Sequence, residues 1–221
     1  MKKIMHILLT LAMVPAMSIA QQSAIKVNVT GSKPGIMDFA RAYCGQFESG
    51  SFERQALAAF VKGSMTRGDK HCVADPKNGY LRYDSSQDGV LETIEMCYWT
   101  CDNKNERLVA VNRINNAMGF DECTLNFYRY NVKTRKMKRI SAPFDCIPQP
   151  VDMVNNENAS KQLLDMVANS TNEDTNKYQP CYELPRTGKD IVFRMAMLDA
   201  LPAEAQRMGV MRWNGSGFVM E

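Results

Sequence analysis

Apolar and polar residues alternate in consecutive short runs across residues 89–140, a pattern typical of β-strands with one buried face. The runs are rich in Val, Ile, Tyr, Trp and Thr, and short polar turns such as CDNKN and VKTRK separate them. A strand just before this stretch opens the series. The expected strands are Tyr80–Tyr83, Val90–Thr100, Glu106–Asn112, Cys123–Asn131 and Lys136–Ile140. This order predicts an antiparallel meander.

Two amphipathic helices are predicted before the meander. After Pro34, a residue suited to a first helical turn, apolar residues recur at helical spacing over Ile36–Phe47. A second apolar stripe follows over Phe52–Val61, and Gly63 is its expected stop. We expect the two helices to form a hairpin that packs on the sheet. The polar segment Ser64–Asn78 is expected to be irregular.

The C-terminal part begins after a proline-rich connection at residues 142–157. A helix is predicted over Ala159–Ala168, an acidic loop over residues 169–177, and strands in CYELP, KDIVFRMAM and GVMRWNGSGFVME, the last a hairpin around Asn214–Gly215. Met96–Trp99 and Val210–Trp213 are similar enough to raise an internal repeat as an alternative. We expect residues 21–141 and 158–221 to be fused into one domain with a single sheet.

The fold class expected from these patterns is α+β. It comprises an antiparallel β-meander sheet of about six to eight strands, covered by the N-terminal helical hairpin and the helix near Leu163.

Residues 1–20 have the pattern of a bacterial secretory signal peptide. Two lysines precede an apolar run, Ile4–Val14, and small residues at Ser18–Ala20 form a cleavage site. The run is shorter than the roughly 20 residues that a spanning helix needs. Gln21, and no lipid-accepting cysteine, follows the cleavage site. We therefore expect a soluble periplasmic or secreted protein after cleavage near Ala20, without a transmembrane segment.

All seven cysteines follow the signal peptide, so export would deliver them to an oxidising compartment. The odd number leaves at least one unpaired. Cys97 and Cys101 lie about 13 Å apart along a strand, beyond the roughly 7 Å that a disulfide allows between Cα atoms. Cys44 lies on an apolar helical stripe, which favours a buried thiol over a disulfide partner.

A calcium-loop pattern spans residues 84–95. Asp84, Ser86, Asp88 and Glu95 occupy ligand positions, and Gly89 falls at the sharp turn. The flanking segments are β-prone, whereas an EF-hand needs helices on both sides. The alternative interpretation is a polar hairpin turn, with Glu95 on the face of a strand. Calcium is the one cofactor that the sequence suggests.

A basic segment at Arg129–Arg139 holds six cations and no acid, next to Tyr128 and Tyr130. As a hairpin tip it would suit an anionic glycan or lipid surface. The alternative is a solvated tip that discourages edge pairing. The formal charge of +3 falls close to neutrality when the signal peptide leaves, which argues against nucleic acid as a partner.

Catalytic motifs are scarce in this sequence. His71 is the only histidine after the signal peptide, and we expect it in a loop without a catalytic role. The first hypothesis is an exported non-enzymatic binding or structural module. The alternatives are a periplasmic hydrolase that uses paired carboxylates, which only their distance in space would reveal, and a calcium-stabilised binding module.

The helix–strand order and the hairpin Trp213-Asn214-Gly215-x-x-Phe218 resemble those of uncharacterised exported α+β proteins of gut-type bacteria. The resemblance implies export and an α+β fold. It implies no catalytic residue.

Overall fold

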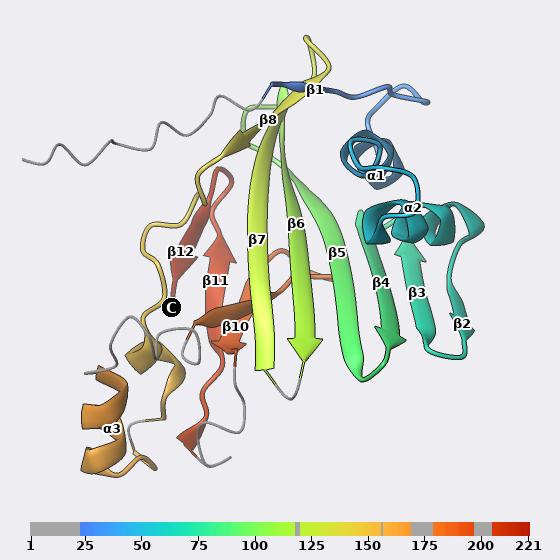
Figure 1. Cartoon of the computed structure of the whole chain (residues 1–221). Coiled ribbons are helices and arrows are strands. Elements are labelled where there is room, and N and C mark those ends of the chain that lie inside the picture. Colours follow the sequence, from blue (N-terminus) through green and yellow to red (C-terminus); the bar gives the residue numbers. More distant parts are fainter. Residues whose placement is uncertain (1–22, 118–119, 156, 169–178, 197–204) are drawn as a thin grey trace, which may run out of the picture.

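The computed structural model describes residues 23–117, 120–155, 157–168, 179–196 and 205–221, and it has the α+β fold that the sequence predicts (Figure 1). The predicted signal peptide and the predicted acidic loop at residues 169–177 lie outside the described residues.

The largest element is an eight-stranded antiparallel sheet in the order β1-β8-β7-β6-β5-β4-β3-β2. From β2 to β8 it is a continuous meander, because each strand pairs with the next in the chain. Its strands are β1 (Ile25–Lys26), β2 (Met65–Arg67), β3 (Lys70–Asp75), β4 (Tyr80–Gln87), β5 (Val90–Thr100), β6 (Glu106–Ala117), β7 (Phe120–Asn131) and β8 (Lys136–Ile140).

Strands β2 and β3 lie in the segment that we expected to be irregular, so that expectation is wrong. Cys72 is buried, and it lies opposite Tyr83 of β4 and Met65 of β2. The polar residues of β3 reach solvent near the sheet edge, where a polar sequence is compatible with a strand. Pairing of β3 with β4, and of β2 with β3, rather than local hydrophobicity, stabilises these strands.

Helices α1 (Ile36–Cys44) and α2 (Phe52–Lys62) confirm the predicted hairpin and cover one face of the sheet. Ser51 caps α2 by accepting a hydrogen bond from the Arg54 backbone at 3.3 Å. Gly63 follows the last turn, as predicted. Phe39 of α1 packs edge-to-face on Tyr130 of the sheet, with ring centroids 5.1 Å apart.

The tail strands form a second, four-stranded sheet, which differs from the expected single sheet. Its strands are β9 (Pro180–Glu183), β10 (Ile191–Met195), β11 (Gly209–Trp213) and β12 (Phe218–Met220). Buried residues such as Phe193 and Phe218 pack against Trp99, Leu108 and Phe127 on the other face of the large sheet. The tail therefore covers the meander face to face instead of extending its edge (Figure 1).

The proline-rich connection leads through a short 3₁₀ helix, η1 (Pro150–Met153), to α3 (Lys161–Ala168). The predicted third helix is thus present. It lies against η1, and Leu163 and Leu164 contact the margin of the apolar cluster between the two sheets. The second sheet, rather than α3, covers the central part of this face.

A disulfide joins Cys123 of β7 to Cys181 of β9, with their Cα atoms 5.4 Å apart. It links the two sheets, and it is consistent with an extracellular location. Cys97 and Cys101 are not joined to each other, and Cys44 is a buried free thiol, as predicted. Burial raises the pKa of Cys44 to about 12. Within the described part of the chain, no helix is long and apolar enough to cross a lipid bilayer.

Candidate functional site

Several connections between strands meet at one end of the molecule. The β3–β4, β5–β6 and β7–β8 turns share this end because the meander is antiparallel. The backbone N–H of Asp102 in the β5–β6 turn donates to the carbonyl of Gly215 in the β11–β12 turn at 2.9 Å. The N–H of Val132 in the β7–β8 turn donates to Asn105 at 2.8 Å. We call this region the turn end.

A pocket of about 340 Å³ opens at the turn end between the two sheets. The β3–β4 turn contributes one wall, the end of β5 another, and the loop after β9 a third. Its lining includes the aromatic residues Tyr98, Trp99 and Trp213 and the polar residues Lys77, Asn78 and Lys189. We call it the aromatic pocket.

Two stacked indoles form the aromatic side of this pocket. The rings of Trp99 and Trp213 lie 5.8 Å apart at an interplanar angle of 26°. Phe218 packs edge-on against Trp99 at 5.1 Å. The Trp99 indole N–H donates to the Lys189 carbonyl at 2.8 Å. Trp99 is therefore held rigidly, with 4% of its surface exposed, while Trp213 is only half-buried.

The β3–β4 turn lies close against Tyr98 because it ends in a glycine. Gly79 has a φ of +70°, and a Cβ there would lie 2.7 Å from the ring of Tyr98. On its other side, the Tyr98 ring packs on Phe39 of α1, with centroids 5.4 Å apart. The wall that carries Lys77 and Asn78 is therefore positioned by the core under the helices.

The charge of the pocket comes from two lysines. Lys77 and Lys189 line it, and neither forms a side-chain ion pair within the described part of the chain. Nearby, Arg186 binds Asp75 at 3.0 Å and ties the loop after β9 to the end of β3. Hydrogen bonds from Arg186 and from Asn78 lower the pKa of Asp75. Asp75 is thus neutralised, and the two lysines are the charged residues of the lining.

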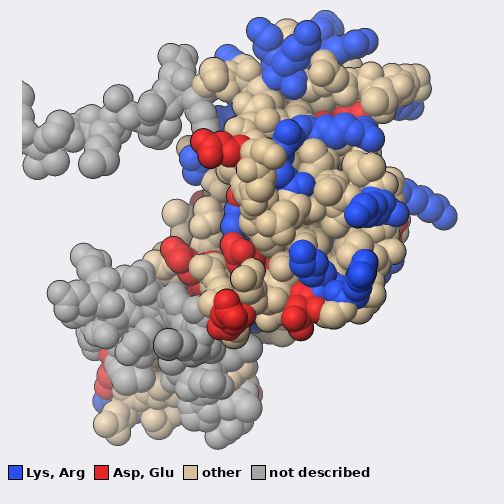
Figure 2. All heavy atoms as spheres, turned by 45° about the vertical axis from the view of Figure 1, so that its right-hand side comes forward, with Lys and Arg blue, Asp and Glu red and all other residues tan. Residues whose placement is uncertain are grey.

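The basic segment predicted from the sequence is the β7–β8 hairpin at the turn end. Figure 2 shows its region, at the top of the molecule in Figure 1, covered by Lys and Arg side chains. Arg129 pairs with Glu106 at 2.8 Å and also donates to the carbonyl of Ser216 at 3.4 Å. Lys136 faces Lys26 of β1 across the strands. The hairpin is thus contiguous with the strands that carry the aromatic pocket.

The residues of the calcium-loop pattern lie on the β4–β5 hairpin. Asp84 and Ser86 belong to β4, Asp88 to the two-residue turn, and Glu95 to β5. Asp88 is separated from Glu95 by more than 16 Å of strand, at about 3.3 Å per residue. Among the described residues, no group of three or more His, Cys, Asp or Glu side chains is placed to hold a metal ion. Calcium binding at this hairpin stays a prediction.

Glu95 instead centres a buried polar network that the sequence did not reveal. One of its carboxylate oxygens accepts hydrogen bonds from the Tyr80 hydroxyl at 2.8 Å and from Arg82 at 3.1 Å. The other accepts from the Asn112 amide at 3.2 Å and from the Leu184 backbone at 3.3 Å. Burial and the charge of Glu95 raise the pKa of Tyr80. These contacts tie β4, β5 and β6 to the end of β9.

Asp84 and Glu95 share the guanidinium of Arg82, which brings two carboxylates close together. Burial acts to raise the pKa of Asp84, but hydrogen bonds from Arg82 and Thr93 outweigh it and lower the pKa. His71, which lies on β3 and not in a loop, also contacts Asp84 at 3.2 Å. A general acid would need a raised pKa. The arrangement suits an ion-pair network better than acid–base chemistry.

The sequence indicated the basic hairpin but not the pairing of Trp99 with Trp213. The one signal was the similarity of Met96–Trp99 to Val210–Trp213, which we considered as a repeat. Both segments bring a tryptophan to the same end, one from each sheet. Comparisons with protein-family models, with curated proteins and with solved structures found no match.

Proposed function

We propose that this protein is an exported, non-enzymatic binding module that takes an anionic glycan at the turn end. The observation that carries the proposal is the aromatic pocket, in which a half-buried tryptophan and two unpaired lysines line one hollow. Export is supported by the signal-peptide pattern and by the disulfide between the sheets.

The pocket chemistry matches a sugar that carries an acidic group. The apolar C–H face of a sugar ring packs on an aromatic ring, and a rigid indole loses little entropy when it does so. Lysine ammonium groups donate charge-assisted hydrogen bonds to a carboxylate or sulfate. Asn78 adds an amide for neutral hydroxyls. A few placed polar groups around an apolar wall are typical of ligand sites.

The β7–β8 hairpin extends this surface for a longer acidic chain. Like charges directly opposite each other, as in Lys26 and Lys136, destabilise a sheet. Arg135 adopts the left-handed conformation, with φ 53°, which glycine or asparagine would adopt more easily. Both features lower the stability of the folded protein. Binding of a polyanionic ligand would give the cations of this hairpin a function.

A glycan fits this end better than a lipid surface or a hydrolase reaction. The large apolar side chains that are well exposed in the described part are Val61, Leu91, Ile147, Val151, Met208 and Val219. None lies on the β7–β8 turn, so nothing there would insert among lipid chains. The carboxylates Asp84 and Glu95 lie outside the lining of the aromatic pocket. A hydrolase that uses paired carboxylates would need acidic side chains in the pocket that holds its substrate.

Tryptophan fluorescence tests the proposal directly, because both tryptophans of the chain belong to the pocket. We expect the mature protein to show a saturable fluorescence change with polygalacturonate and none with neutral dextran. Trp213→Ala should weaken binding about tenfold or more, since it removes the aromatic wall. Calorimetry supplies the affinity where the fluorophore is lost.

The double variant Lys77→Gln/Lys189→Gln should also weaken binding and reduce its dependence on salt. The matched control is Arg54→Gln/Lys161→Gln, which removes two exposed cations remote from the pocket. Equal loss in both double variants would indicate general charge attraction only. Absence of any polygalacturonate signal would refute the proposal.

A further inference from the structure

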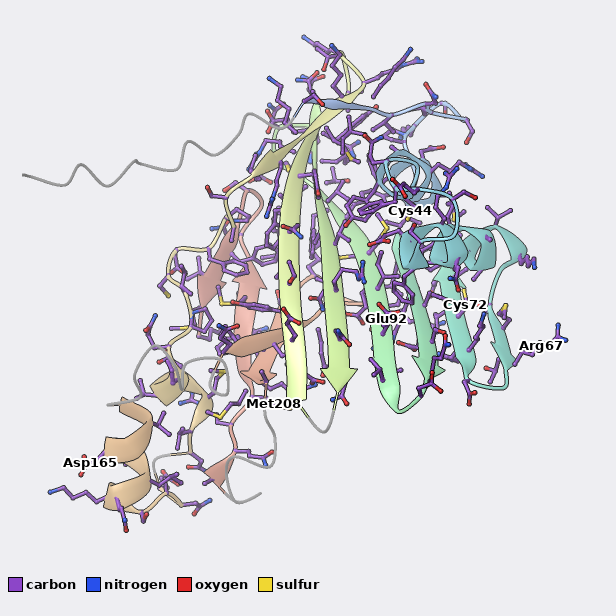
Figure 3. The ribbon with its side chains drawn as sticks, in the orientation of Figure 1. Cys44, Arg67, Cys72, Glu92, Asp165 and Met208 are labelled. Atoms are coloured by element: carbon purple, nitrogen blue, oxygen red, sulfur yellow. A yellow bond between two sulfur atoms is a disulfide. The ribbon has the colours of Figure 1, made fainter. Side chains whose placement is uncertain are left out.

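A second hollow, of about 540 Å³, lies at the opposite end of the large sheet. It is formed where the β2–β3 hairpin and the end of β4 extend beyond α2 on the helix side. Figure 3 shows Arg67 at the free edge of the sheet in this region, far from the turn end. Its polar lining includes Gln55, Lys62, Arg67, Lys70, Ser85 and Ser86. We call it the edge hollow.

Three cations from three elements line the edge hollow. Arg67 of β2 and Lys70 of β3 face each other directly across the two-residue turn, and Lys62 ends α2. None of the three forms an ion pair within the described part of the chain. Two like charges at directly opposed positions destabilise a hairpin. The arrangement therefore lowers the stability of the hairpin, although cations on the edge strand β2 also discourage pairing with another sheet.

The residues that line the hollow have an excess of positive charge. Asp69 is the acid that lines the hollow, and it leaves an excess of two positive charges there. Glu92 lies opposite Ser85 on β5, but it pairs with Arg113, which also binds Glu53 of α2. Figure 3 shows Glu92 towards the middle of the sheet, away from Arg67. In Figure 2 this side of the molecule carries many basic and few acidic side chains.

Neutral donors complete the lining. Ser85, Ser86 and Gln55 also line the hollow. Side chains alternate along β4, so the Ser85 hydroxyl is on the helix face with Tyr83, and that of Ser86 is on the other face. Lys70 is paired in register with Ser85, so the ammonium and the hydroxyl are neighbours on one face. The backbone N–H of Ser86 donates to the carbonyl of Asp69 at 2.8 Å and ties the β2–β3 turn to β4. The backbone that carries Lys70 and Ser85 is thus held in place.

From these contacts we propose that the edge hollow is a binding site for a tetrahedral oxyanion, the phosphate or sulfate group of a small molecule. Guanidinium, ammonium and hydroxyl groups are the donors that such groups prefer. The volume of the edge hollow exceeds that of a phosphate or sulfate ion, so the rest of a phosphorylated or sulfated small molecule would also fit. The site shares no residue with the aromatic pocket, so it stands independently of the proposed glycan function.

Titration of the mature protein with inorganic phosphate tests this site. Sodium phosphate is compared with sodium chloride at equal ionic strength, by calorimetry and by melting temperature. We expect saturable phosphate binding at one site and a higher melting temperature than in chloride. Inorganic sulfate is the second probe. Binding of either anion supports the site, and the preference between them identifies the group.

The variant Arg67→Gln/Lys70→Gln should weaken phosphate binding at least about tenfold, since two charge-assisted contacts are lost. Both side chains are exposed, and removal of their mutual repulsion should leave the fold at least as stable. The variant Lys77→Gln/Lys189→Gln, at the aromatic pocket, should bind phosphate normally. Equal effects of phosphate and chloride, or unchanged affinity in the Arg67/Lys70 variant, would overturn the proposal.

Discussion

At the scale of single residues, Glu95 shows how its surroundings decide the role of a carboxylate. Only 2% of its surface is exposed, and all four of its hydrogen-bond donors come from other segments. A buried charge is tolerated when it is paired and its lone pairs are satisfied. In sequence the same residue closes a calcium-loop pattern. In the fold it connects the two sheets.

Substitution of Glu95 by glutamine should therefore destabilise the protein by about 3 kcal/mol, because Arg82 loses a buried partner. The new amide would also point its N–H groups at donors, either Asn112 and the Leu184 backbone or Tyr80 and Arg82. The measurement is urea denaturation monitored by circular dichroism.

Glu92→Gln is the control. Glu92 is 41% exposed, and its loss should change stability by about 1 kcal/mol or less. Equal effects of the two substitutions would argue against the buried network.

At the scale of elements, the β4–β5 hairpin explains why a calcium-loop pattern occurs here. Asp88 and Gly89 have φ angles of 52° and 79°, and two consecutive positive φ values are the requirement of a tight hairpin turn. Asp-Gly satisfies that requirement well. The same dipeptide occupies adjacent positions in a calcium loop. One local sequence thus fits two structures, and the strand pairing of β5 distinguishes them.

We expect the melting temperature to be the same in millimolar calcium and in excess chelator. Binding at a hundredfold excess over the dissociation constant would add about 2.7 kcal/mol. For a chain of this size that is a rise of roughly 5 to 11 °C. Such a rise, lost in Glu95→Gln, would establish the calcium site and contradict the hairpin interpretation. Magnesium at the same concentration controls for ionic strength.

At the scale of the whole molecule, the protein is a three-layer stack of helices, large sheet and small sheet. Two apolar clusters lie on opposite faces of the meander. Each strand of its centre contributes to both, as β5 does with Met96 on one side and Trp99 on the other. The second sheet is held to the first by this packing, by the Glu95 network and by the Cys123–Cys181 disulfide.

The double variant Cys123→Ala/Cys181→Ala should lower the free energy of unfolding by about 2 to 4 kcal/mol. The bridge spans 58 residues in sequence, and closure of a loop of that length restricts the unfolded chain. Urea denaturation of the oxidised protein and of the variant gives the difference. Cys146→Ala, which removes an exposed free thiol, should leave the stability unchanged. A stable variant with an unchanged midpoint would show that packing and the Glu95 network hold the sheets together without the disulfide.

Local patterns in the sequence were sufficient for the helices and most of the meander. The apolar stripe ending before Gly63 and the alternation in Val90–Thr100 depend on neighbours close in the chain, so periodicity reveals them. The basic hairpin was equally evident, because its six cations lie close together between Arg129 and Arg139. Strands β2 and β3 were missed because partner strands, and not their own composition, stabilise them.

Only the tertiary structure decided which residues meet across long sequence separations. Trp99 and Trp213 form one wall, Cys123 pairs with Cys181, and the Leu184 backbone reaches Glu95. The sequence by itself predicted the order of the meander strands from β4 to β8 and the positions of charge, because these are properties of contiguous residues. The pocket and the edge hollow depend on how the second sheet and α2 lie on the meander. That placement is set by packing of whole faces, which no local window of residues contains.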